Sequence, residues 1–361
     1  MRTISILPWL ESFVEGVRRT QVLTIAALVE ALLVAEVVCV TVVGREVRGV
    51  SKPRYGIKRL DRFLGNHGIA VREVQKSIAK TVSKRNPRPW RVALDWTSLS
   101  KDRFSMLTAS VVVRGRAFPI FWLVERTGAL KNRKTFLVKL AVERLREIVP
   151  EGQEIVLLAD REFGNCIVAK AAMAAGFGFV LRCRGCIYID GKGYSGAFSG
   201  LDVRGGRVRL VPQAQLTRKR SVIVTAVATW QRGQKEAWYL ISNLDEGARA
   251  IIHHYGRRFR IEEMFRDSKE MRFGLKIEAL RVRTPERVDR VMLLLALAYL
   301  LWLASGEDAV RSGRYRDVQT NSTARRTLSI FRLGQFYLKR HPLPVAQVFV
   351  MLAESMEAKW G

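Results

Sequence analysis

The segment RVALDWTSLSKDRFSMLTASVVVRGRAFPIFWLVER, residues 91–126, carries the pattern that decides the fold. β-Branched and aromatic residues dominate three runs, at 91–95, 104–115 and 117–126, and short polar or glycine-containing turns separate them. Such runs favour strands because branched and ring side chains pack well on a pleated surface. We therefore predict a three-stranded antiparallel meander.

Helices and strands alternate after the meander. Apolar residues recur at helical spacing over 135–149, and EIVLLAD at 154–160 is an apolar strand that ends in an acid. A helix through NCIVAKAAMAAG, 165–176, and the strand GFVLRC, 178–183, complete the pattern. Three strands, helix, strand, helix, strand is the order of an RNase H-like core. The predicted fold class is α/β, with an RNase H-like mixed sheet flanked by helices.

Two of the predicted strands have an aspartate directly after their apolar residues. Asp95 follows the apolar residues of VALD, and Asp160 ends the run VLLAD. The predicted fold puts these two segments on adjacent central strands. We expect the two carboxylates to meet although they are distant in sequence.

A third acid lies in YGRRFRIEEMFRDSK, residues 255–269. At about 100° per residue, four side chains of this stretch fall within roughly 60° on one helical face; they are Tyr255, Arg258, Glu262 and Lys269. Cations that contact phosphate oxygens, beside a carboxylate that holds an ion, suit a phosphodiester next to a divalent metal. Glu262 thus completes a candidate carboxylate triad, whereas Glu263 would point about 100° away.

The composition indicates a polyanionic partner. The chain has 62 Lys plus Arg against 33 Asp plus Glu, a net charge of +29 over 361 residues, and 48% hydrophobic residues. This apolar content allows a sizeable core, so the charge belongs to a folded protein rather than to a disordered arm. Charge alone fits DNA, RNA or an acidic membrane surface.

Two stretches of the sequence are apolar enough to be candidates for membrane spans. Residues 22–43 contain Glu30 and Glu36, and a carboxylate near a bilayer centre costs roughly 2.5 to 3.5 kcal/mol. Residues 291–304 number 14, fewer than the roughly 17 to 25 that span a bilayer. We predict a buried helix for each stretch, no membrane partner and, because no signal-peptide pattern is present, a cytoplasmic location.

Composition shifts divide the chain into blocks. Helical patterns with basic faces precede the helix-breaking stretch SKRNPRPW, 83–90, and offer Lys58, Arg59, Arg62 and Lys76 to a DNA backbone. Glycine and β-branched residues then dominate 184–246, with QRGQ at 231–234 as a hairpin turn. The predicted blocks are an N-terminal helical DNA-binding domain at 1–88, a catalytic core at 89–183 and 247–305, a β insertion at 184–246 and a C-terminal helical region at 306–361.

The spacing of Tyr255, Arg258, Glu262 and Lys269 is that of the YREK signature. Together with LDWT and ADREFG, it resembles the DDE transposases of the fourth bacterial insertion-sequence family, which move DNA by cut and paste. The similarity covers about residues 90–305. The resemblance implies that Asp95, Asp160 and Glu262 bind two Mg²⁺ ions, for which Mn²⁺ can substitute, and catalyse excision and strand transfer. It also implies double-stranded DNA as partner and a homodimer assembled on paired transposon ends.

The same resemblance implies further DNA contacts. Tyr255, Arg258 and Lys269 would hold phosphates of the transposon end, and a tryptophan of the β insertion would stack on a flipped base. Trp230 and Trp238 are the candidates, with packing within a hairpin as the alternative. Arg161 either contacts phosphate or is simple surface charge.

Two other functions stay open. One is an RNase H-like nuclease that cuts DNA without transposing it. The other is a noncatalytic DNA-binding derivative of such an enzyme, and the intact acids at 95, 160 and 262 argue against it.

Overall fold

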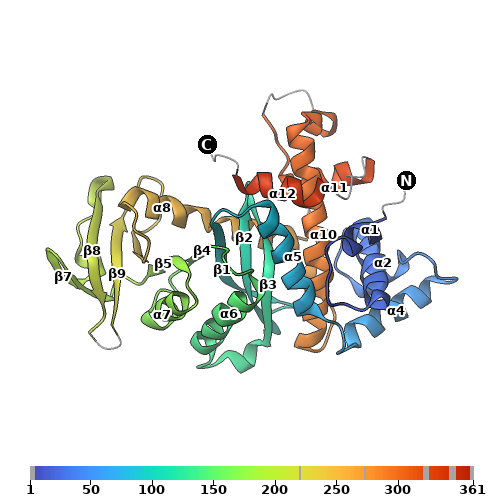
Figure 1. Cartoon of the computed structure of the whole chain (residues 1–361), viewed down its shortest axis with the longest axis horizontal. Helices are drawn as coiled ribbons and strands as arrows, with labels where there is room; N and C mark the ends of the chain where they lie inside the picture. The colour runs from blue at the N-terminus through green and yellow to red at the C-terminus, as the bar shows by residue number, and fades with distance from the viewer. Residues whose placement is uncertain (1–4, 219–220, 272–273, 320–324, 341–346, 358–361) are drawn as a thin grey trace.

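A single mixed β-sheet forms the centre of the protein (Figure 1). The computed structural model describes residues 5–218, 221–271, 274–319, 325–340 and 347–357. Ten strands lie in the order β3-β2-β1-β4-β5-β10-β9-β8-β6-β7. The strand that begins at Trp90 therefore lies inside the sheet, with neighbours on both sides.

The predicted core order is confirmed. The strands β1 (Trp90–Leu99), β2 (Phe104–Val113) and β3 (Arg116–Arg126) form the antiparallel meander. The strands β4 (Ile155–Ala159) and β5 (Gly178–Cys183) then add in parallel beside β1. Every residue of β2 and β4 is buried, which explains their nearly continuous apolar sequences.

The β insertion continues the core sheet. Its last strand, β10 (Trp238–Ser242), pairs antiparallel with β5, and β9 (Val222–Thr229) pairs with β10. The strands β8 (Val208–Leu216), β6 (Tyr188–Gly191) and β7 (Tyr194–Ala197) extend the same sheet to its far edge. Because backbone hydrogen bonds run across this junction, the insertion is an extension of the core sheet.

Helices that alternate with the strands along the chain pack on the sheet. The helix α6 (Lys134–Ile148) precedes β4, and α7 (Cys166–Ala174) connects β4 to the parallel strand β5. The two helices contact each other on one face of the sheet, and α5 (Val71–Arg85) lies beside α6 (Figure 1). The predicted N-terminal domain thus contributes a helix that packs against the core.

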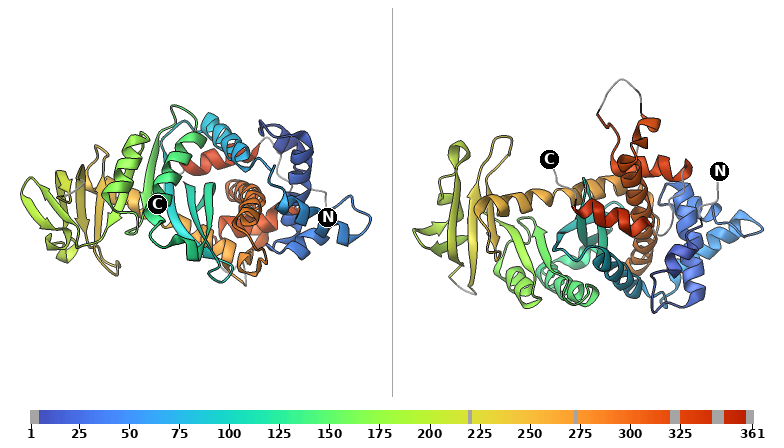
Figure 2. Two further views of the ribbon diagram at one scale, coloured as in Figure 1. Left: turned by 90° about the horizontal axis from the view of Figure 1, so that it is seen from below. Right: turned by 45° about the horizontal axis from the view of Figure 1, so that its top comes forward.

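The helix α10 (Pro285–Arg311) connects the two halves of the molecule. It contacts β3 on one side and the N-terminal helices on the other, as the view along its axis shows (Figure 2, left). At 27 residues it is much longer than the apolar stretch at 291–304. Its length and apolar composition would by themselves allow it to cross a membrane. However, 94% of its most apolar window is buried inside the protein, so it is a core helix of this fold.

The apolar stretch at 22–43 forms two helices, whereas the sequence predicted one. The helix α2 (Arg19–Ala35) ends where Glu36 adopts a left-handed conformation with φ 51°, and α3 (Val40–Arg45) follows. Both acids of the stretch have partners: Glu30 accepts the backbone N–H of Ile6 at 2.8 Å, and Glu36 pairs with Lys339 at 2.7 Å.

The other helices surround α10. On the N-terminal side these are α1 (Leu7–Glu11) and α4 (Pro53–Gly65); on the C-terminal side they are α11 (Ile330–Arg340) and α12 (Val348–Glu357). The helix α4 contacts α10 directly, and α12 contacts both α10 and α5. Helices from both ends of the chain therefore share one core.

Candidate active site

Two aspartates lie at neighbouring positions of adjacent strands, although β1 continues beyond Asp95 to Leu99. Asp95 is in β1, and Asp160 directly follows β4. The two strands are parallel, with Leu94 opposite Ala159, so the next residue of each strand is an aspartate. The adjacency that the strand order predicted is therefore present.

A turn fixes the backbone around Asp160. Its carboxylate accepts the N–H of Glu162 at 2.9 Å, and its carbonyl accepts the N–H of Phe163 at 3.0 Å. Asn165 then caps α7 by accepting the N–H groups at its start. The chain thus leaves the sheet in one defined direction just after the acid.

The predicted helix 248–270 is interrupted. The helix α8 (Ala248–Arg257) and the helix α9 (Arg260–Lys269) are separated by Arg258 and Phe259. Hydrogen bonds there join residues three apart, from Arg258 N–H to the carbonyl of Tyr255 and from Ile261 N–H to that of Arg258. The tight turn shifts the later side chains from their ideal helical positions; Tyr255 is buried, while Arg258 still contacts both Tyr255 and Glu262.

Arg258 links two of the three candidate acids. Its guanidinium donates to Asp95 at 3.3 Å and to Glu262 at 2.7 Å, while its side chain is 6% exposed. The guanidinium also lies 4.6 Å from the centre of the Phe259 ring. The sequence predicted Arg258 as a phosphate ligand, but in this structure it is a buried cation shared by two carboxylates.

The environment of Asp95 disfavours its ionised form. The pKa of Asp95 is raised to about 7, chiefly by burial and also by the carboxylates of Asp160 and Glu262, against the opposing effect of Arg258. The acids are thus near enough to repel one another. Such a cluster gains stability from an added cation.

The donor chemistry fits a hard divalent ion after one rearrangement. Among the described residues, no group of three or more His, Cys, Asp or Glu side chains lies close enough to hold a metal. Glu262 faces Arg258, but its side chain is 50% exposed and can therefore rotate. With Glu262 turned toward Asp95 and Asp160, three carboxylate groups would supply the oxygen ligands that Mg²⁺ prefers.

Tyr255 and Trp238 pack against each other. The Tyr255 side chain is fully buried, and its ring meets that of Trp238 edge to face with centres 4.8 Å apart. Phe259 contacts both rings. Tyr255 thus forms an aromatic cluster between α8 and β10, and its contact with a phosphate stays a prediction.

The remaining predicted residues lie around the acids or on the surface. Lys269 ends α9 near Glu278, and burial lowers the pKa of Lys269 while Glu278, Asp102 and Asp95 oppose this shift. Arg161 is 58% exposed and pairs with Glu236 at 3.4 Å. Trp230 is 43% exposed in the connection between β9 and β10. Of the two tryptophans, Trp230 has the more open ring.

Comparison with known proteins agrees with this geometry. The family described as Transposase DDE domain matches residues 86–301, more than half of the chain. The chain belongs to the transposase DDE domain family. None of the curated proteins compared with this chain matches it. The matched range includes Asp95, Asp160 and Glu262, so all three candidate acids belong to the DDE domain.

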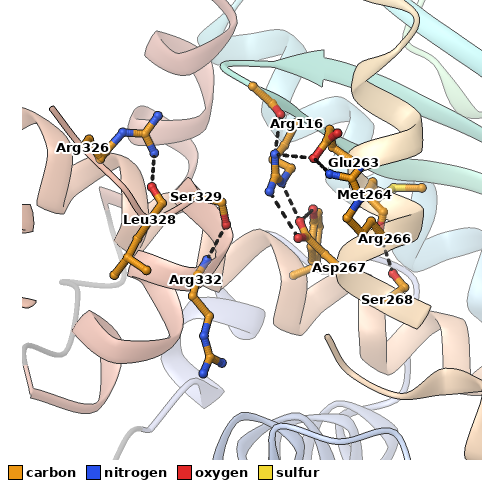
Figure 3. A network of polar contacts seen from close by, with 12 residues as sticks. Arg116, Glu263, Met264, Arg266, Asp267, Ser268, Arg326, Leu328, Ser329 and Arg332 are labelled. Atoms are coloured by element: carbon orange, nitrogen blue, oxygen red, sulfur yellow. Dashed lines mark hydrogen bonds and ion pairs between the residues drawn. The ribbon is translucent and has the colours of Figure 1, made fainter. Parts of the chain in front are cut away.

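A buried network that the sequence did not reveal anchors α9 in the DDE domain (Figure 3). Arg116 of β3 donates two hydrogen bonds to Asp267, at 2.6 and 3.3 Å, and the Tyr299 hydroxyl donates to the same carboxylate at 2.7 Å. Glu263 also faces Arg116, at 3.3 Å, in agreement with its exclusion from the triad. These partners lie on three separate elements, so no local spacing could have identified them.

A second network holds α8 against the sheet of the DDE domain. Arg91 of β1 donates to His254 at 3.0 Å, and the other ring nitrogen of His254 lies 3.0 Å from Glu246. Burial, followed by the charge of Arg91, lowers the pKa of His254, while Glu246 opposes this shift. The histidine pair at 253–254 was visible in the sequence, but its link to Arg91 required the fold.

Proposed function

We propose that the protein is a DNA transposase of the YREK group, which excises and inserts an insertion sequence by metal-dependent phosphoryl transfer. One observation carries the proposal: Asp95 within β1 and Asp160 directly after β4 follow paired residues of adjacent parallel strands, and Arg258 links Asp95 to Glu262. Membership in the transposase family supports it.

The three acids have distinct tasks in this proposal. Two Mg²⁺ ions, which Mn²⁺ can replace, would activate water or a 3′-hydroxyl and stabilise the departing oxygen. Asp95 would give up its proton as it becomes a ligand, because the ion favours the carboxylate. Glu262 would leave Arg258 by rotating, and Asp160 is already directed by the turn that follows β4.

The cations near the acids would bind DNA when the site closes. Arg258, once Glu262 has turned away, would retain its contact with Asp95 and present free donors to a phosphate. Lys269 would add a positive charge on the same side of the acids. Arg161, which follows Asp160, and Trp230 of the β9–β10 connection are both exposed and would meet the strand at the protein surface.

The wider assembly follows from the same proposal. The basic α4 and α5 would contact duplex DNA outside the active site. Two copies would assemble on paired transposon ends in the cytoplasm, each cutting DNA held by the other. Strand transfer into a target plasmid separates this function from that of a nuclease.

The proposal is tested with purified protein and the DNA that flanks its gene. We expect cleavage at the element ends with Mg²⁺ and none with EDTA, and Asp95→Ala should abolish cleavage while retaining DNA binding. Asp245→Asn, in an exposed turn before α8, is the matched control and should cleave normally. Cleavage by the Asp95→Ala protein would remove Asp95 from the mechanism.

A further inference from the structure

We propose that a basic cleft on the outer side of α8 and α9 binds a DNA phosphate backbone, separately from the acid site. This inference rests on the proposed function, since it assigns a second DNA contact to the same enzyme. It concerns residues outside the YREK signature.

The cleft is open and lined by cations. Its volume is about 530 Å³, and its lining includes Arg249, Arg257 and Arg260 together with His253. The described lining contains no acidic residue. Trp238 and Ile252 contribute apolar surface, against which the sugar face of a nucleic-acid strand can pack.

The basic residues occupy the side of the helix away from the acids. At about 100° per residue, Arg249, His253 and Arg257 fall within roughly 80° on α8, and Tyr255 falls on the opposite side. Tyr255 points into the aromatic cluster, as its complete burial shows. The helix α8 therefore lines the cleft, while Arg258, directly after its last residue, reaches the acid site.

Positively charged side chains lie close together in the cleft. The pKa of Arg257 is lowered to about 10, chiefly by burial and also by the nearby cations Arg91 and Arg260. Arg257 donates to the Nε2 atom of His253 at 2.9 Å, a geometry that needs a neutral imidazole. Arg249 lies in the first turn of α8, where a cation opposes the helix dipole. Arg249, Arg257 and Arg260 line one cleft, so an anion bound there would interact with several of them at once.

A phosphodiester strand is the occupant that this combination favours. A row of arginines suits successive phosphates, and the tryptophan and isoleucine suit the less polar sugars. Gln231, beside the exposed Trp230, lies at the border of the cleft, so a strand leaving it would pass over the β9–β10 connection. A single inorganic phosphate could bind one group of arginines in the same way, but it could not reach along the whole cleft as a strand does.

The experiment measures affinity for end DNA in EDTA by fluorescence anisotropy over a range of salt concentrations. The test variant is Arg249→Gln with Arg260→Gln; the control is Lys139→Gln with Lys170→Gln, which removes the same charge from the α6–α7 face. The test variant should bind about tenfold more weakly, with a log–log salt slope smaller by about 2. Equal binding by test and control variants would overturn the inference.

Two additional measurements separate the other outcomes. Thermal unfolding checks that the double variant is folded, and Arg249→Glu, a single change at an exposed residue, should weaken binding even if the double variant is unstable. Saturable binding of inorganic phosphate, with an unchanged DNA salt slope, would identify a simple anion site and overturn the DNA assignment. If the wild-type protein neither bound nor cut DNA, the proposed function itself would fail.

Discussion

Arg258 stabilises the acids of the candidate site in the absence of a metal. Its buried guanidinium is shared between Asp95 and Glu262, so it neutralises repulsion that the fold creates. Removing one partner of a buried ion pair leaves uncompensated charge. The residue that the signature assigns to DNA thus has a structural task in the free protein.

Arg258→Gln should lower the free energy of unfolding by about 2 kcal/mol at pH 8, because Asp95 and Glu262 lose their common cation. Urea denaturation in EDTA measures the change. Arg266→Gln is the matched control, since this exposed arginine pairs with Glu263 on the surface and should change stability by less than about 0.5 kcal/mol. Equal effects of the two changes would show that the shared contact contributes little.

Asp95→Asn should stabilise the metal-free protein increasingly as pH rises. The folded pKa of Asp95 is about 7, above an unfolded value near 3.9, so the folded state binds the extra proton between these values. The wild-type protein therefore loses this stability as pH rises from about 4 to about 7, and the variant does not. Denaturation in EDTA at pH 5 and pH 8 should show an advantage for the variant that grows by roughly 2 to 4 kcal/mol. A pH-independent difference would contradict the shifted pKa.

At the level of elements, α9 is positioned by groups outside the acid site. Asp267 joins it to β3 through Arg116 (Figure 3). The same carboxylate joins it to α10 through Tyr299. The position of Glu262 therefore depends on contacts several residues further along the helix.

Asp267→Asn should destabilise the protein by about 2 to 4 kcal/mol, since an amide cannot replace the carboxylate opposite the buried guanidinium of Arg116. Thermal or urea unfolding measures this loss. Glu143→Gln, which breaks the exposed pair with Lys139, should change stability by less than about 1 kcal/mol. Wild-type stability in the Asp267 variant would show that the network does not anchor α9.

The crossing of α10 and α11 depends on a glycine. A Cβ atom at Gly334 would lie 1.8 Å from the carbonyl oxygen of Trp302, so Gly334→Ala should cost at least about 2 kcal/mol as the helices separate. The control is Gly256→Ala in α8, where a Cβ meets nothing within 4 Å. That change should instead stabilise the protein by about 0.5 to 1 kcal/mol, because alanine favours a helix. Differential scanning calorimetry of both variants would reveal the expected opposite shifts.

For the whole molecule, one continuous sheet and one long helix combine regions that the sequence separated into blocks. The β insertion shares backbone hydrogen bonds with the core sheet, and α10 packs between β3 and the N-terminal helices. A net charge of +29 is carried on this single framework.

Binding to nonspecific duplex DNA should weaken steeply with salt. A protein with 6 to 10 phosphate contacts loses about 10³- to 10⁵-fold in affinity between about 50 and 200 mM salt, through release of counterions. Anisotropy titrations of the wild-type protein measure this dependence. A nearly salt-independent affinity would mean that the positive charge serves another purpose than contact with DNA.

Local sequence determined the order of strands and helices and placed Asp160 at the end of β4, whereas β1 continues past Asp95 to Leu99. Periodicity and turn residues act over a few positions, which is why these features could be predicted. The same reasoning placed Glu262 on a helix with Arg258, but an ideal helical wheel could not anticipate the tight turn between α8 and α9.

Tertiary structure alone decided which groups face one another. It buried Tyr255 against Trp238, placed Arg258 between Asp95 and Glu262, and joined Arg116 of β3 to Asp267 of α9. The physical reason is that burial and charge pairing depend on distances between segments far apart in the chain. Those distances raise the pKa of Asp95, and no property of its immediate sequence neighbours would do so.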